Sequence, residues 1–387
     1  MKRLESADVY RGFVMFLMMA EVLYLEKVAE NTPGNSFWSF LALQQTHVAW
    51  VGCSLHDMIQ PSFSFLVGVV LPYSIASRTS LNLPFNQLLL TALKRSLILI
   101  LLGVFLRSMH SESTNWTFED TLTQIGLGYP FLFLLGFRSI KFQYIAFIGL
   151  LFVYWLLFTL YPLPNTDFDY LAAGVSQNWE HNLTGFAAHW NKNTNIAWAF
   201  DQWFLNLFPR EKIFNFNGGG YATLSFIPTL ATMILGLVAG NQLKSDKPIF
   251  EKLKFFLYLA TGLIISSLIL QFTGICPIVK RIWTPSWVLF SGGICFLFLA
   301  LFIKLVDING YKYFNWLKII GMNSIAAYVL ADTVRGFIKN SFEIHLGSGF
   351  FKLAGDAYET IISGSCVLLT LWLILYWMYK KKLFIRI

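Results

Sequence analysis

Residues 46–68 read T-H-V-A-W-V-G-C-S-L-H-D-M-I-Q-P-S-F-S-F-L-V-G and place two histidines and one aspartate at the start of an apolar helix. Charged side chains at membrane depth are costly and usually face a protein interior or a water-filled cavity. His47 and Asp57 are ten residues apart, so they converge if the chain turns into the membrane between them. The stretch therefore predicts a proton-handling pair at a membrane surface.

The rest of the chain has the composition of a membrane protein. Of its 387 residues, 56% are hydrophobic and only 13% are charged, whereas a soluble domain carries about 25% charged residues. The mean hydropathy is +0.57, and apolar runs of near-spanning length recur. We predict an all-α, polytopic integral membrane helical bundle in a lipid bilayer. The net charge is +8, and the basic residues cluster between the apolar runs. This placement indicates that they set the membrane topology rather than bind nucleic acid.

The hydrophobic pattern predicts about ten transmembrane helices in a single domain, 1–387. The expected spans are 8–25, 55–77, 87–106, 121–136, 142–160, 221–241, 254–273, 285–305, 315–333 and 358–379. The fourth contains two glycines and Pro130, so we expect it to be broken where it faces protein or water. Most lysines and arginines, including Lys2, Arg3 and Arg386, fall on the inner side if both termini are inside, which favours an N-in/C-in topology.

The segment 161–220 is too long for a simple connection and is expected on the non-cytoplasmic side. It contains Trp179, Trp190, Trp198 and Trp203 among many asparagines. One interpretation is an interfacial cap with an aromatic belt. The other is a surface on which sugars stack above an active site.

His47 is the candidate general base, because a histidine titrates near neutral pH. Asp57 could orient and stabilise the imidazole, as the carboxylate of a catalytic triad does. The alternatives are an interfacial histidine packed near Trp50 and a carboxylate favoured by the helix macrodipole. His56 is expected to point elsewhere on the helix.

Other polar residues in apolar surroundings are candidate ligand contacts. Arg11, Lys94 and Arg95 could bind phosphates, since arginine forks suit that geometry, or could be charges that set topology. Asn323 and Ser324 could bind a ligand or join helices. Further candidates are Glu21, near the outer end of the first helix, and Asp332, at the outer end of the ninth.

Several familiar signatures do not occur in the sequence. It has no P-loop, Rossmann fingerprint, H-E-x-x-H or G-x-S-x-G motif, which argues against ATP-driven transport and serine hydrolysis. The four cysteines lack the spacing of a metal site, so we predict no metal. The residues alone indicate a multi-helix protein with a polar centre.

Six segments, in order, resemble the heparan-alpha-glucosaminide N-acetyltransferase family of transmembrane acyltransferases, including its bacterial relatives. They are R-L-E-S-A-D-V-Y-R-G at 3–12, H-V-A-W-V-G at 47–52 followed by Asp57 and Pro61, R-S-L-I-L at 95–99, residues 122–129, residues 283–307, and G-M-N-S-I at 321–325. Each match is weak alone, but together they cover nearly the whole chain. Gln124 stands where the family has an arginine, and Glu21 stands where an asparagine is expected.

The resemblance implies a function and a set of site residues. His47 would be the catalytic histidine, with Asp57 beside it. Acetyl-CoA would bind from the cytoplasm at Arg11, Lys94, Arg95, Gln124, Asn323 and Ser324, and a glucosamine-type acceptor would bind on the opposite side, near Glu21, Trp50 and Asp332. The implied location is a bacterial inner membrane with His47 facing the periplasm, and a homodimer is suggested. The alternatives are an O-acyltransferase of surface polysaccharide and a non-catalytic sugar transporter or flippase.

Overall fold

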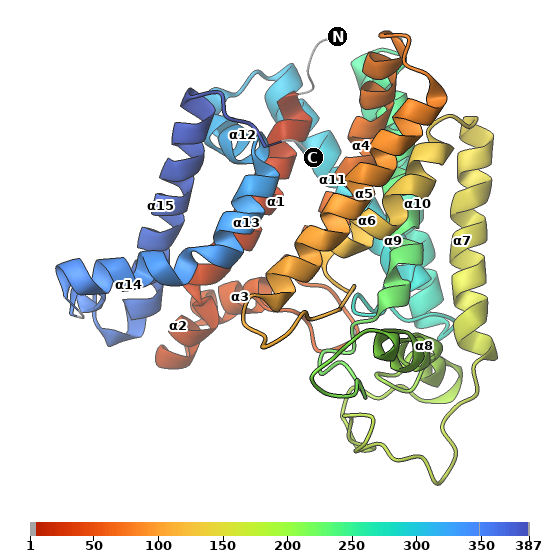
Figure 1. Ribbon diagram of the computed structural model, residues 1–387, viewed down its shortest axis with the longest axis horizontal. Coiled ribbons are helices and arrows are strands. Elements are labelled where there is room, and N and C mark those ends of the chain that lie inside the picture. Colours follow the sequence, from red (N-terminus) through yellow and green to blue (C-terminus); the bar gives the residue numbers. More distant parts are fainter. Residues whose placement is uncertain (1–4, 348, 386–387) are drawn as a thin grey trace. The chain divides into compact units, whose positions relative to one another are not determined.

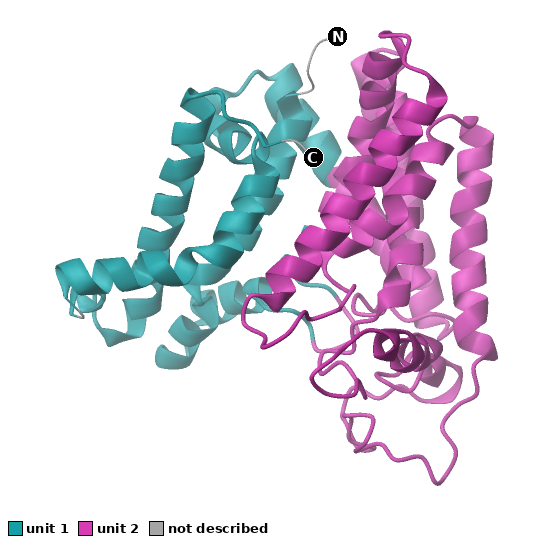
Figure 2. Cartoon of the chain, in the orientation of Figure 1, with its two compact units in different colours: residues 1–48, 53–59, 298–386 teal, residues 49–52, 60–297, 387 magenta. Residues whose placement is uncertain are grey.

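The computed structural model describes residues 5–347 and 349–385. In these ranges the chain is helical, with one isolated β-bridge between Val51 and Val279 and no strand. It forms two compact units (Figure 2). Unit 1 holds the described residues of 1–48, 53–59 and 298–386, and unit 2 holds those of 49–52 and 60–297. Lys2, Arg3 and Arg386, which entered the predicted topology and the opening motif, lie outside the described residues.

Unit 1 is organised by the packing of α1 (Glu5–Met19) against α12 (Asn315–Gly321). The two backbones are so close that a Cβ on Gly12 would collide with the Leu317 carbonyl, and one on Gly321 with the Asp8 carbonyl. The unit also contains α2 (Leu25–Asn31), α3 (Ser36–Gln45), α13 (Ser324–Thr333), α14 (Arg335–Leu346) and α15 (Glu359–Lys380). Figure 1 shows α14 lying across the ends of α13 and α15.

Unit 2 is a bundle around α9 (Phe226–Lys244), whose apolar stretch is 83% buried. Around it lie α4 (Ile59–Thr79), α5 (Phe85–Ser108), α6 (Thr121–Leu135), α7 (Ile140–Leu160), α10 (Ile249–Phe272) and α11 (Pro285–Phe302), which continues into unit 1. The apolar stretches of α5, α7 and α10 are only 22–33% buried. Their exposed leucine, isoleucine and phenylalanine side chains fit lipid contact, because lipid does not penalise apolar surface.

The cap, which we define as residues 161–222, lies at one end of the unit 2 bundle (Figure 1). It is mostly irregular chain, with one α-helix, α8 (Ile196–Phe204), whose first turn is capped by the Asn195 side chain. Of its four tryptophans, Trp190 is fully buried and Trp203 is exposed. The buried tryptophan makes the cap a packed part of unit 2.

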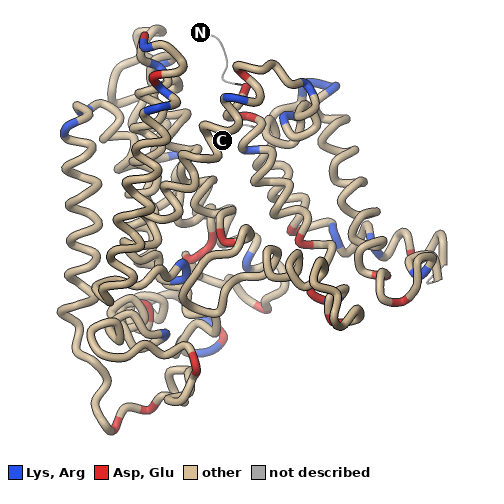
Figure 3. Tube along the Cα trace, turned by 180° about the vertical axis from the view of Figure 1, so that it is seen from behind, with Lys and Arg blue, Asp and Glu red and all other residues tan. Residues whose placement is uncertain are grey.

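Seven helices are long and apolar enough to cross a membrane, at 56–79, 85–108, 140–160, 223–244, 249–272, 285–308 and 356–380 among the described residues. They match seven of the ten expected spans. The other three are helical but shorter: α1, α6, and a ninth span that breaks at Met322–Asn323 into α12 and α13. The expectation that the fourth span is broken was wrong, because α6 continues through Pro130 as one helix. Charged residues are sparse along the long helices and concentrate in loops and at helix ends (Figure 3). The count of ten and the N-in/C-in orientation stay predictions.

Candidate active site

The structure brings His47 and Asp57 into direct contact within unit 1. α3 ends at Gln45, residues 46–55 form a loop, and a 3-10 turn at His56–Met58 leads into α4. His47 Nδ1 lies 2.8 Å from Asp57 Oδ1. The Asp57 side chain is 1% exposed, whereas that of His47 is 37% exposed. The imidazole is therefore held by a buried carboxylate and is itself partly exposed.

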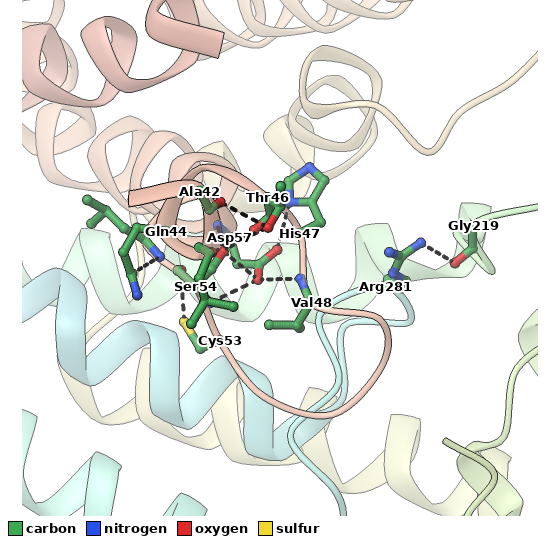
Figure 4. A network of polar contacts seen from close by, with 12 residues as sticks. Ala42, Gln44, Thr46, His47, Val48, Cys53, Ser54, Asp57, Gly219 and Arg281 are labelled. Carbon is green, nitrogen blue, oxygen red and sulfur yellow. Dashed lines mark hydrogen bonds and ion pairs between the residues drawn. The ribbon is translucent and has the colours of Figure 1, made fainter. Parts of the chain in front are cut away.

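The second carboxylate oxygen fixes the loop that carries the histidine (Figure 4). Asp57 Oδ2 accepts hydrogen bonds from the Val48 N–H at 3.3 Å and the Ser54 N–H at 3.0 Å, and it lies 3.0 Å from the Ser54 hydroxyl. That hydroxyl also lies 2.6 Å from the Thr46 carbonyl. Because these donors belong to Val48 and Ser54, at the two ends of the segment that follows His47, the carboxylate shapes the loop as well as contacting the ring.

This arrangement determines which ring nitrogen is basic. When Asp57 is ionised, its carboxylate can only accept hydrogen bonds, and Nδ1 of His47 then carries the proton in their contact. Nε2 of the neutral ring then holds the basic lone pair. A proton taken up at Nε2 would make an imidazolium that the adjacent carboxylate stabilises. The pair can thus accept a proton from a bound nucleophile.

The structure also places His56 beside His47, which the sequence interpretation had wrong. Their ring centroids are 4.7 Å apart, and His56 is buried. The expectation that His56 points elsewhere assumed an α-helix, but residues 56–58 form a tighter 3-10 turn, which changes the side-chain direction. The sequence feature that could have predicted this proximity is the position of His56 directly before Asp57.

The remaining unit 1 candidates lie in different settings. Arg11 pairs with Asp8 at 3.5 Å on the same face of α1. Glu21 is exposed on the 3-10 turn after α1, Ser324 is half-buried at the start of α13, and Asp332 is exposed near the end of α13.

The side-chain amide of Asn323 forms hydrogen bonds with backbone groups of the C-terminal segment. Its Nδ2 donates to the Leu383 carbonyl at 2.8 Å, and its Oδ1 accepts from the Ile385 N–H at 3.0 Å. These bonds favour the structural alternative, in which Asn323 fastens the C-terminal segment at the break between α12 and α13.

In unit 2, Arg95 stands out from its neighbour Lys94, which is exposed. Arg95 lies about 15 Å along α5 from its first residue. Its guanidinium stacks 4.7 Å from the Tyr129 ring centroid, and Nη1 donates to the Tyr129 hydroxyl at 3.2 Å. Its Nε is buried and has no hydrogen-bond partner among the described residues. A buried unsatisfied donor of this kind suits an anionic ligand.

Gln124 and Trp50 hold the cap side of unit 2 together. Gln124 is buried, and its Nε2 donates to the Phe118 carbonyl at 2.6 Å and to the Thr223 carbonyl at 3.2 Å. The Trp50 indole is 1% exposed and donates to the Trp190 carbonyl at 3.0 Å. These contacts support structural roles for two residues that the sequence assigned to ligands.

A group of buried and half-buried carboxyls lies where the cap meets α6, and the sequence analysis did not single it out. Burial raises the pKa of Asp201 to about 7, and it also raises the pKa values of Glu119 and Asp120. Asp201 Oδ2 accepts from the Thr223 N–H at 2.9 Å, but its buried Oδ1 has no hydrogen-bond partner among the described residues. Burial therefore favours the protonated form of Asp201 more in the folded cap than in the unfolded chain.

The Asp201 carboxyl is expected to make unit 2 less stable as pH rises. An unfolded aspartate has a pKa of about 3.9, so its contribution is complete below about pH 4 and is lost as pH rises through about 7. Asp201→Asn keeps an acceptor for Thr223 and removes the charge. We expect this variant to have a higher Tm than wild type at pH 7.5 and the same Tm near pH 4. The free energy of unfolding should change by roughly 1.4 kcal/mol for each unit by which the folded and unfolded pKa values differ. The measurement is thermal unfolding in detergent across pH.

The matched control is Asp167→Asn, at an exposed carboxyl of the same cap. It should leave the Tm-against-pH curve unchanged. Parallel curves for wild type and Asp201→Asn would show that Asp201 keeps an ordinary pKa in the folded protein.

Comparison with known proteins finds relatives that align with the whole chain. The whole chain aligns with the heparan-alpha-glucosaminide N-acetyltransferase of Mus musculus at 24% identity over 425 residues and with that of Homo sapiens at 23% over 423. The chain spans about 60% of the length of these curated relatives. No protein-family profile matches it.

Seven spanning helices and these alignments identify an integral membrane protein of helical fold. Within that class, the chain is a family-level relative of the heparan-alpha-glucosaminide N-acetyltransferases, which confirms the resemblance seen in the sequence.

Proposed function

We propose that this protein is a transmembrane acetyltransferase that moves an acetyl group from acetyl-CoA to the amine of a glucosamine-type sugar, with His47 as the general base. The observation that carries the proposal is the 2.8 Å contact between His47 Nδ1 and the buried Asp57 carboxylate. This contact supports the proposal, because an ionised Asp57 would fix the tautomer and the orientation of the base. The relationship to membrane N-acetyltransferases supplies the reaction class.

The transfer is a nucleophilic substitution at a thioester. The amine nitrogen attacks the acetyl carbonyl carbon, the new C–N bond forms, and the C–S bond breaks. His47 Nε2 takes the proton that the amine loses, and Asp57 stabilises the resulting imidazolium. The proton then passes to the departing CoA thiolate or to water. Holding donor and acceptor together at the base lowers the entropic part of the barrier.

Basic side chains supply candidate contacts for the donor. We propose that acetyl-CoA enters from the cytoplasm and that its phosphates are bound in unit 2 by Arg95 and Lys94. Arg11, in unit 1, is a separate candidate for the same role. The unsatisfied Nε of Arg95 supports this role. The acceptor would arrive from the other side, which places His47 toward the periplasm of a bacterial inner membrane. The homodimer suggested by the resemblance is not required by this scheme.

The test is incubation of the purified protein with labelled acetyl-CoA and glucosamine, followed by detection of N-acetylglucosamine, beside a thermal-shift assay with CoA. Product and a CoA shift would support the proposal. An O-acetylated product would move it to the O-acyltransferase alternative. Neither product nor shift would favour a transporter.

A covalent relay would use the same residues in two steps. His47 Nε2 would take the acetyl group from the thioester, the thiolate would leave, and the sugar amine would then attack the acetyl-imidazole. We expect direct transfer, so protein given acetyl-CoA without acceptor should keep its intact mass. Gain of one acetyl group by wild type, and none by His47→Ala, would establish the relay instead.

A further inference from the structure

An open groove runs along the surface of unit 2 between α6 and α7, two helices that both pack on α9. Its volume is about 540 Å³, within the range of roughly 300–1,000 Å³ that is common for ligand sites. Leu230 of α9 contributes to the lining, and Arg138 is the only charged side chain among the described residues that line the groove. None of these residues has a role in the proposed reaction.

Small residues on α7 leave the space that forms the groove. The lining residues on this helix recur at the spacing of a single helix face and are Phe142, Ala146, Gly149, Leu150 and Val153. A Cβ at Gly149 would meet nothing within 4 Å. From Phe142 to Val153 the stripe extends about 17 Å along the helix axis, which is close to half of the ~30 Å hydrocarbon core of a bilayer. The groove therefore has the depth of one lipid leaflet.

Arg138 lines the groove beside the first turn of α7, in the short connection from α6. This connection is held by the buried Gln143, whose Nε2 donates to the Arg138 carbonyl at 3.1 Å. Asn241 Nδ2 in turn donates to Gln143 Oε1 at 3.1 Å, which ties the connection to α9. The guanidinium lies 6.0 Å from the Phe142 ring centroid, and no carboxylate in residues 5–347 or 349–385 pairs with it. Its charge is therefore available to an anion at this end of the groove.

We propose that the groove binds an anionic phospholipid, with one acyl chain along the α7 stripe and the phosphate at Arg138. The exposed Lys141, in the first turn of α7, adds a second positive charge at the same end. Arginine binds phosphate oxygens through its planar fork, and basic pockets between membrane helices bind lipid head groups. An apolar groove of one-leaflet depth with a cation at its end fits a lipid better than it fits a helix of another protein. The inference does not depend on the proposed reaction.

The experiment titrates lipid-depleted, full-length protein in detergent with dioleoyl phosphatidylglycerol or dioleoyl phosphatidylcholine, which have the same acyl chains. The rise of Tm with lipid concentration measures the affinity, and we expect tighter binding of the anionic lipid. Arg138→Gln should lower the affinity for phosphatidylglycerol about tenfold. Lys254→Gln, at an exposed lysine near the start of α10, is the matched control and should change the affinity less than about twofold. Equal affinities of the two lipids for wild type, or an unchanged affinity in Arg138→Gln, would overturn the head-group assignment.

Gly149→Phe tests the groove itself, because the added ring would occupy the space of the acyl chain. We expect this variant to lose the bound phosphatidylglycerol that native mass spectrometry detects on wild type. Gly262→Phe on α10, where a Cβ would also meet nothing within 4 Å, is the matched control and should keep it. Wild-type lipid occupancy in Gly149→Phe would overturn the site. If Gly149→Phe instead converts a dimer into monomers and leaves lipid binding unchanged, the groove belongs to an interface between two copies of the chain and the lipid proposal fails.

Discussion

Replacing His47 with alanine is expected to lower kcat/KM for acetyl transfer by about 10²–10⁴-fold, the range that a positioned general base contributes. The substitution removes Nε2 of His47, the ring nitrogen that does not contact Asp57 and that we propose as the base. The affinity for CoA should be unchanged, because the thioester carbonyl meets the base only during the reaction. Rates with acetyl-CoA and glucosamine, beside CoA thermal shifts, measure both quantities.

The fold should survive this substitution, so lost activity can be assigned to lost chemistry. Asp57 Oδ2 would still accept the Val48 and Ser54 N–H bonds that shape the loop. We expect a Tm within a few degrees of wild type. His345→Gln, at an exposed histidine of the same unit, is the matched control and should keep full activity. Wild-type kcat/KM in His47→Ala would remove the histidine from the mechanism.

Asp57→Asn is the companion variant, because it tests orientation rather than the base. An amide in place of the carboxylate can no longer stabilise the imidazolium, and its NH₂ group can force the proton from Nδ1 to Nε2. The activity should fall as severely as in His47→Ala, and the double variant should be no worse than either single one, since the two residues act as a unit. Additive losses would mean that they act independently.

The sequence predicted the parts of the site that depend on local chain geometry. Ten residues with a turn between them are enough to bring His47 to Asp57, and no distant contact has to be known. Hydropathy likewise placed Arg95 within an apolar helix, where it is found. His56 was misplaced because the choice between an α-helical turn and a 3-10 turn depends on how the loop before it is bonded, including the Gln44 side chain that accepts the Leu55 N–H at 3.0 Å.

The sequence could not predict which buried side-chain amides bond to the protein backbone and which are available to bind a ligand. Gln124 and Asn323 were sensible ligand contacts by type, yet both bond to backbone groups at least 60 residues away in the sequence, at Thr223 and Leu383. Those backbone partners lie in distant segments of the chain, so their positions depend on the tertiary fold and not on the local sequence. The break of the ninth span at Asn323 was missed for the same reason, since its flanks are as apolar as those of an unbroken helix.

The second large effect is expected from Gly12→Ala, which should destabilise unit 1 by about 3 kcal/mol, the upper end for overpacked sites. The added Cβ would occupy the place of the Leu317 carbonyl oxygen, and backbone cannot move aside as a flexible side chain can. Gly321→Ala should behave alike, because its Cβ would collide with the Asp8 carbonyl on the facing helix. Small residues at such crossings let membrane helices approach closely.

This packing gives a physical reason for two of the segments that carry the family resemblance. Arg11-Gly12 and Gly321-Met-Asn-Ser lie more than 300 residues apart in the chain, and their glycines are the places where α1 and α12 touch. The measurement is Tm in detergent. The control is Gly262→Ala on α10, where a Cβ would meet nothing within 4 Å and where alanine improves helix propensity by about 1 kcal/mol. A Tm for Gly12→Ala equal to that of Gly262→Ala would show that α1 and α12 are not in backbone contact, and the explanation of both motifs would fail with it.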